Sequence, residues 1–373
     1  MKSLLFPFSR RFQVAAAVLS GAVALMSSAH ASSVEDWQRL KAMSPRGYLI
    51  GKTAMPVTVD GKLDDPAWAT APWTDAFEDI EGSVRPKPKY RTRAKMIWDD
   101  RYLYIAAELE EPHVWGTLKD HDSVIFRDND FEFFIEPDGD NHNYYEFEMN
   151  ALNTTWDLLL VKPYKDGGPA LNEFELHGLK SAVYVDGTLN DPRDTDRGWT
   201  LEIAIPWAAL RQKTSQNCPP KSGDFWRIGF SRVEWQINIV EGKYEKVPGT
   251  KEDNWVWSPQ GIVDMHRPER WGVARFTEQA PGSGSFQNDP TLAVRDALHE
   301  IYYHQRDFHG THQRYADSLQ ELGMQAPAFP GQKGNPVIKP RGKGYEVVVE
   351  RDSGGGVEVW KIREDAKVTH SKK

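Results

Sequence analysis

Short runs of strand-forming residues, each closed by turn residues and not separated by helices, fill the chain from Val57 to Phe276. In the run 92–98, apolar and polar side chains alternate with a period of two, which is typical of a strand with one buried face. Comparable runs recur, at 102–107, 131–136, 144–150, 155–161, 182–185, 199–205, 227–234 and 271–276. This pattern predicts a mainly β protein, built as an antiparallel β-sandwich of the jelly-roll type.

The pattern changes after a Gly/Ser-rich segment at 281–285, which is typical of a flexible linker. Beyond it, apolar residues follow helical spacing, and a hairpin is predicted around the glycines at 354–356. The predicted organisation has five parts: a signal peptide at 1–31, an irregular N-terminal lead at 32–54, the β-sandwich at 55–280, a linker at 281–290, and a small C-terminal α+β module, helical and hairpin, at 291–373.

The first 31 residues have the composition of an export signal. Lys2, Arg10 and Arg11 precede an uncharged apolar run, and Ala29-His30-Ala31 supplies the small-x-small pattern that signal peptidases cleave. The apolar run is shorter than the roughly 20 residues that span a bilayer. We therefore expect cleavage after Ala31, a periplasmic or extracellular mature protein, and no membrane association once the signal is removed.

Charge and cysteine content exclude several classes of function. The formal net charge is −8, so the chain lacks the basic surface that binds a nucleic-acid backbone. Cys218 is the only cysteine, which excludes an intramolecular disulfide, a CxxC metal site and c-type haem attachment. A neutral polar ligand, such as a sugar, remains compatible with this composition.

Several motifs in the predicted sandwich occur in a characteristic order. They are Val-Thr-Val-Asp-Gly-Lys-Leu-Asp-Asp-Pro-Ala-Trp at 57–68, Trp-Asp-Asp-Arg-Tyr-Leu-Tyr at 98–104, Asp-Phe-Glu-Phe-Phe-Ile-Glu at 130–136, Gly-Trp-Thr-Leu-Glu-Ile-Ala-Ile-Pro-Trp at 198–207, Gly-Phe at 229–230 and Pro-Glu-Arg-Trp-Gly at 268–272. In this order they resemble the family 9 carbohydrate-binding modules, over about residues 57–276. The chain is similar to a remote branch of that family.

The resemblance implies a calcium-containing β-sandwich that binds oligo- or polysaccharide and is typically attached to plant-polysaccharide hydrolases. In the family, two aromatic rings clamp a sugar, while carboxylate, amide and guanidinium groups bond its hydroxyls. This chemistry suits a pyranose, which has apolar faces and a rim of hydroxyl groups. The function expected is a carbohydrate-binding accessory to polysaccharide breakdown, with a glycoside hydrolase as a candidate partner.

Some of the family's binding residues have counterparts in this chain. Glu132 matches the sugar-binding glutamate, and Phe126 falls where one clamp aromatic is expected. Glu148 stands where an arginine is usual, and Arg232 where an amide is usual. Arg232 and Glu234 point to one face of a strand, so an internal ion pair is as good an interpretation as a ligand contact. Three further residues complete the predicted site: Asn150, Trp257 and His266. The family's second clamp tryptophan is expected shortly before Pro268, where this chain has Met265-His266-Arg267.

Two other functions remain open from the sequence. Related sandwiches house b-type haem in electron-transfer subunits, for which Met149, Met265 and His266 are the candidate axial ligands. A glycoside hydrolase acting on O-glycosyl bonds would need two carboxylates across a cleft, and no motif places them there, so no catalytic residue is predicted.

No cofactor is predicted with certainty, although a structural calcium ion is compatible with the sequence. The oxygen-rich segment 138–143 has ligands that calcium prefers, but its Asp, Asn and Gly residues also suit an ordinary hairpin turn. The turn is the favoured interpretation. No zinc site is proposed for the histidines of the C-terminal module.

Overall fold

A computed structural model describes residues 32–373, so the predicted signal peptide lies outside the described residues. Within this range, thirteen strands belong to one curled sheet. They are β1 (Gly47–Lys52), β2 (Glu78–Asp79), β3 (Thr92–Trp98), β4 (Tyr102–Glu110), β5 (Asp130–Glu136), β6 (Tyr144–Asn150), β7 (Thr155–Leu160), β8 (Ala170–Leu171), β9 (Lys180–Asp186), β10 (Gly198–Pro206), β11 (Phe225–Glu234), β14 (Asp253–Val256) and β15 (Gly272–Thr277). A separate hairpin pairs β12 (Ile237–Val240) with β13 (Lys243–Lys246).

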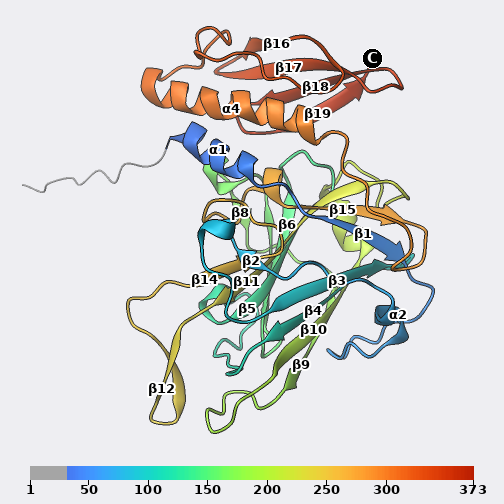
Figure 1. Cartoon of the computed structure of the whole chain (residues 1–373), viewed down its shortest axis with the longest axis vertical. Helices are drawn as coiled ribbons and strands as arrows, with labels where there is room; N and C mark the ends of the chain where they lie inside the picture. Colours follow the sequence, from blue (N-terminus) through green and yellow to red (C-terminus); the bar gives the residue numbers. More distant parts are fainter. Residues whose placement is uncertain (1–31) are drawn as a thin grey trace, which may run out of the picture. The chain divides into compact units, whose positions relative to one another are not determined.

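The sheet forms a β-sandwich, which confirms the predicted fold class. Its strand order is β8-β7-β6-β5-β11-β15-β1-β3-β4-β10-β9. The pairs that β1 makes are parallel and the others are antiparallel. Figure 1 shows how the sheet curls. The buried faces of β3, β4 and β10 share one hydrophobic core with those of β5, β6 and β11. In β5, for example, Phe131, Phe133 and Ile135 enter this core, whereas Glu132 and Phe134 point to the opposite, outer face.

The segment 32–54 corrects one expectation, because it is not an irregular lead. Ser32 and Glu35 form a capping box that starts helix α1 (Ser33–Ala42). Strand β1 then inserts between β15 and β3, parallel to both, with Tyr48 and Ile50 buried in the sandwich core. The sandwich therefore begins at β1, upstream of residue 55.

The C-terminal module contains the predicted helix and hairpin. Helix α4 (Leu292–His312) packs on a four-stranded antiparallel sheet (Figure 1). The strands of this sheet are β16 (Gln332–Arg341), β17 (Gly344–Asp352), β18 (Val357–Arg363) and β19 (Val368–Lys372). Gly310 lies within the last, solvent-exposed turn of α4 and requires no special backbone angle there.

The remaining helices are short. They are α2 (Pro66–Ala69) and α3 (Trp207–Leu210), with the 3-10 turns η1 (Gly82–Val84), η2 (Ile125–Arg127), η3 (Tyr164–Asp166), η4 (Arg211–Lys213) and η5 (Pro268–Arg270). None of the helices in the described range is long and apolar enough to cross a membrane.

Candidate functional site

A pocket of about 180 Å³ opens on the outer face of β5, β6 and β7. Antiparallel register places Glu132 opposite Glu148, and Glu148 opposite Trp156, while Phe134 stands opposite Glu146. Because side chains two residues apart on a strand share a face, these five side chains lie on one surface. The strands therefore supply the floor of the pocket.

Loops from distant parts of the chain complete its walls. Phe126 of η2 stands at the rim with 38% of its surface exposed, so part of its ring remains accessible. Tyr164 of η3, Met265 and His266 close another side, and Tyr164 and His266 meet edge to face at 4.5 Å between ring centroids. The remaining lining residues are Val233, Glu252 and Asn254.

Three carboxyl groups of the pocket are buried. Burial raises the pKa of Glu132 to about 7. Burial, reinforced by the neighbouring charge of Glu132, raises the pKa values of Glu146 and Glu148 well above their usual range. The structure therefore buries the acidic residues of this sheet face instead of exposing them to solvent.

His266 contributes a neutral imidazole to the same pocket. Its Nδ1 lies 3.0 Å from the Tyr144 hydroxyl, and its Nε2 lies 4.0 Å from Oε1 of Glu146. Burial lowers the pKa of His266 to about 4, so the ring carries no charge at neutral pH. It offers a polar edge to a ligand without neutralising the glutamates.

Helix α4 holds the loops that form this side of the pocket. Next to Tyr164, Asp166 accepts a hydrogen bond from the hydroxyl of Tyr302 and pairs with Arg306 at 3.1 Å. Next to His266, Arg267 donates to the hydroxyl of Tyr303 at 2.9 Å. The C-terminal module thus positions two walls of the pocket, a role that the sequence did not predict.

Four of the seven predicted site residues come together in this pocket: Phe126, Glu132, Glu148 and His266. Sequence reasoning did not assign Glu146, Trp156, Tyr164, Glu252, Asn254 and Met265 to the site. Strand alternation could have found Glu146, which lies two residues before Glu148. The loop residues carry no comparable local signal.

Asn150 is a structural residue at the end of β6. Its side-chain oxygen accepts hydrogen bonds from the backbone of Leu152 and Thr154, and its amide nitrogen donates to Leu118 O and to Asp128. These partners satisfy the side chain inside the turn that follows the strand. The structure therefore places Asn150 outside the pocket, contrary to expectation.

Trp257 also lies away from the pocket, in the hydrophobic core. Its side chain is 1% exposed, and its ring packs against Phe230 and edge-on against Tyr48. A buried ring has no free face on which a sugar could stack. Trp257 is a packing residue, which corrects its assignment to the site.

Arg232 forms the internal ion pair that was one of its two interpretations. It is 1% exposed, and its guanidinium binds Glu111 at 2.7 Å and Glu234 at 2.8 Å. It also donates to the Thr92 hydroxyl and to Glu110 O. All its strong partners are protein groups, so the structure does not support a ligand contact for Arg232.

The candidate haem ligands do not converge. Met149 points into the sandwich core, whereas Met265 packs with the cluster on the outer face, where His266 also lies. The sheet separates the two groups because alternate residues of β6 face opposite sides. The three residues therefore cannot act together as axial ligands in this fold.

The segment 138–143 forms the turn between β5 and β6, as favoured from the sequence. Its acidic groups already have partners: Asp138 accepts from Ser215, and Asp140 pairs with Lys367 at 2.9 Å. Arg295 of α4 also donates to Gly139 O. These contacts attach the turn to its surroundings, although Asp138 and Asp140 also lie with the buried Glu136 in a group of carboxylates that could hold a metal ion.

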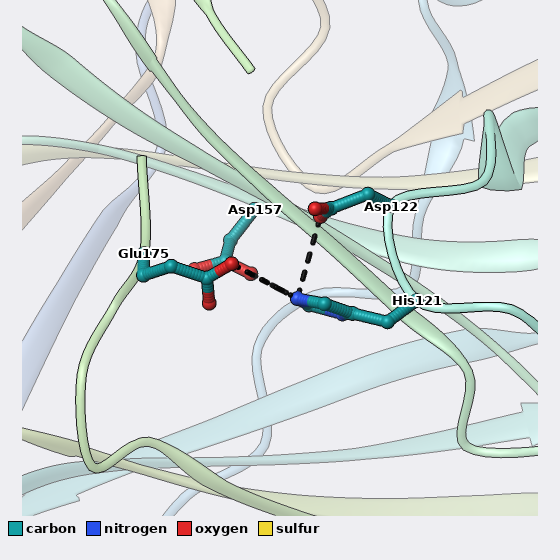
Figure 2. Close-up of side chains that lie close together, drawn as sticks. All are labelled: His121, Asp122, Asp157 and Glu175. Atoms are coloured by element: carbon teal, nitrogen blue, oxygen red, sulfur yellow. Dashed lines mark hydrogen bonds and ion pairs between the residues drawn. The ribbon is translucent and has the colours of Figure 1, made fainter. Parts of the chain in front are cut away.

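A second group of polar side chains could hold a metal ion (Figure 2). Nε2 of His121 faces Glu175 at 3.1 Å, Asp122 at 3.4 Å and Asp157 at 3.9 Å. Nδ1 of the same ring lies 3.0 Å from Thr155 O, a contact that fixes the ring orientation. One imidazole with three carboxylates suits a first-row divalent metal better than calcium, which prefers oxygen ligands.

A larger hollow of about 800 Å³ lies beside β4 and β10, and its arginines form exposed ion pairs with neighbouring carboxylates. Arg91 pairs with Glu108, and Arg197 pairs with Asp186. Its exposed ion pairs are ordinary surface features. The pocket on β5, β6 and β7 is therefore the better candidate for a specific site.

A family model described as "Carbohydrate family 9 binding domain-like" matches residues 59–275, which include every strand that forms the pocket. The chain belongs to this family. The match confirms the resemblance found in the sequence motifs. The family 9 domain covers most of the sandwich, whereas α4 and its sheet lie outside the matched residues.

Similar proteins include two polysaccharide hydrolases. The endo-1,4-beta-xylanase C of Paenibacillus barcinonensis is 28% identical over 159 residues, which is 43% of this chain. An exoglucanase of Acetivibrio thermocellus is 25% identical over 157 residues, or 41% of the chain. The matched region spans only 12% of each relative's length.

Among solved structures, a family 9 carbohydrate-binding module of Caldicellulosiruptor kristjanssonii was crystallised in complex with cellotriose. It has a TM-score of 0.39 and 12% identity, and the comparison covers 65% of this chain and 100% of the module. The same module in complex with glucose gives a TM-score of 0.39 and 13% identity.

Proposed function

We propose that this protein binds carbohydrate in the pocket on β5, β6 and β7, as an accessory to polysaccharide breakdown. The observation that carries this proposal is the exposed ring of Phe126 at the rim of a pocket whose floor holds buried carboxyl groups. An aromatic ring suits the apolar face of a sugar, and carboxyl groups suit its hydroxyls. Membership of the family and similarity to a xylanase and an exoglucanase support the same role.

The size of the pocket favours a small part of a glycan. Its 180 Å³ is several times the roughly 30 Å³ that one water occupies in the liquid, yet below the roughly 300 Å³ at which drug-sized sites begin. One sugar ring, at a chain end or on a branch, is therefore the ligand unit that we propose. A partner glycoside hydrolase would act on the same polysaccharide.

The proposal is tested by titrating the mature chain with oligosaccharides in a calorimeter, after a glycan-array screen selects the best ligand. Phe126→Ala is expected to weaken binding by about tenfold, since an aromatic contact contributes up to about 1.5 kcal/mol beyond area burial. The melting temperature should change little, because the ring is already 38% exposed.

Tyr184→Ala provides a matched control, since Tyr184 is a similarly exposed aromatic residue on β9, outside the pocket. This variant should bind like the parent protein. Equal affinity of the Phe126 variant and the parent protein for the selected glycan would place the binding site elsewhere.

We further propose that the protein acts outside the cytoplasm, after cleavage following Ala31. This cleavage leaves Ser32 in place, and Ser32 is the residue whose side chain caps α1. N-terminal sequencing of the exported protein is expected to begin at Ser32. Exported material that still begins at Met1 would contradict this expectation.

A further inference from the structure

The pocket has an unusual balance of charge. Four carboxyl groups line it, those of Glu132, Glu146, Glu148 and Glu252, and among the described residues no lysine or arginine does so. Lys246, whose charge acts on Glu252, is outside the lining and lies over the ring of Trp235 at 3.5 Å. The imidazole of His266 is neutral. The lining therefore lacks a positive charge of its own.

Hydrogen bonds from the residues that the structure describes leave part of the Glu132 carboxyl group without a partner. Its side chain is 4% exposed, and within the described part of the chain its Oε2 has no hydrogen-bond partner. Glu148, 2% exposed, accepts one hydrogen bond through Oε2, from the backbone nitrogen of Phe126 at 2.9 Å. A buried polar atom without a partner is costly, so such an atom beside a cavity points to a missing group.

The aromatic residues in the walls of the pocket also suit a cation. Phe126, Phe134, Trp156 and Tyr164 surround the glutamates. Aromatic rings attract cations through the negative charge of their faces, and the attraction strengthens when the cation is removed from water. A group of glutamates among aromatic rings is thus suited to an ammonium group, which donates three hydrogen bonds and carries one positive charge.

We propose that the pocket selects a sugar that carries a protonated amine, such as a glucosamine unit of a partly or fully deacetylated polysaccharide. This inference rests on the proposed function and specifies its ligand class. The ammonium group donates to Glu132 and Glu148, which face each other across β5 and β6. The sugar ring contacts the aromatic rim at Phe126. With a neutral sugar bound, these buried carboxyl groups would have no cation nearby to favour their charged form.

The alternative occupant of the acidic floor is a divalent cation. Asp130, Glu132 and Glu148 each offer an oxygen atom within 4.8 Å of the others, and Oδ2 of the buried Asp130 also lacks a partner among residues 32–373. Calcium takes six to eight oxygen ligands, and one oxygen of Glu148 is already engaged. The floor therefore suits an ammonium group better, and the experiment separates the two.

The experiment uses three trisaccharides: chitosan triose, its fully N-acetylated form and cellotriose. The mature chain is titrated with each in EDTA at pH 7, close to the pKa of about 7 that burial gives Glu132, so that both the amine and this carboxyl can be charged. Chitosan triose is expected to bind at least about tenfold more tightly than either neutral sugar, because hydrogen bonds to charged groups are roughly twice as strong as neutral ones. Glu132→Gln and Glu148→Gln should each remove most of this preference.

Glu278→Gln serves as the matched control, since Glu278 is exposed and pairs with Lys52 outside the pocket. It should preserve the preference, and thermal melts verify that all variants fold. Tighter or equal binding of the neutral sugars would overturn the amine proposal and leave the proposed function standing. Failure to bind any glycan would overturn both. Binding that EDTA abolishes and calcium restores would assign the floor to a metal and overturn the amine proposal.

Discussion

Arg232→Met is expected to destabilise the protein by about 3–5 kcal/mol, because it leaves the carboxylates of Glu111 and Glu234 buried without their cation. This is a large part of the roughly 5–15 kcal/mol by which proteins of this kind are stable. Urea unfolding of residues 32–373, followed by tryptophan fluorescence, measures the change. Ligand binding should survive wherever the variant remains folded.

Two variants test the origin of this effect. Arg197→Met removes an exposed arginine that pairs with Asp186, and should leave the unfolding midpoint nearly unchanged. The triple variant Arg232→Met, Glu111→Gln, Glu234→Gln removes the buried charges together and should recover most of the lost stability. If Arg232→Met unfolds at the same urea concentration as Arg197→Met, the ion pair has no structural importance.

Glu132→Gln is expected to stabilise the protein at pH 8, by on the order of 3 kcal/mol, because one pKa unit corresponds to about 1.36 kcal/mol. Burial raises the pKa of Glu132 to about 7, from 4.5. A carboxyl whose pKa is higher in the folded state favours folding when protonated. Its contribution is complete below pH 4.5 and is lost as the pH rises through 7. Glutamine resembles the protonated form at every pH.

The difference in stability between Glu132→Gln and the parent protein should therefore be small at pH 4 and largest above pH 7. Because this quantity is the difference between the two free energies of unfolding, the contributions of all titrating groups that both proteins contain cancel. Glu278→Gln, at an exposed position, should show no such trend. A stability difference that does not change between pH 4 and pH 8 would mean that Glu132 does not titrate in this range. Residues that lower the stability of the folded protein in this way are typically retained because they serve its function.

Local patterns predicted the sandwich because a strand with one buried face must alternate every second residue. Phe131, Phe133 and Ile135 enter the core, as their spacing required, and Glu132, which alternates with them, lines the pocket on the outer face. Strand β1 was missed since the run 47–52 is short and follows a helix. Its parallel pairing with β15 joins residues more than 200 positions apart, which no local pattern encodes.

By itself, the sequence determined the fold class and the family, because strand period and motif order are local properties. The resemblance to that family also pointed to Phe126 and Glu132, which the structure places in one pocket. The tertiary structure alone decided which neighbouring groups share the pocket. From the sequence, Trp257 was assigned to the site and Trp156 was not, yet Trp257 is buried in the core and Trp156 lines the pocket. Burial, and with it the charge state of the glutamates, depends on loops that α4 holds in place from a distant part of the chain.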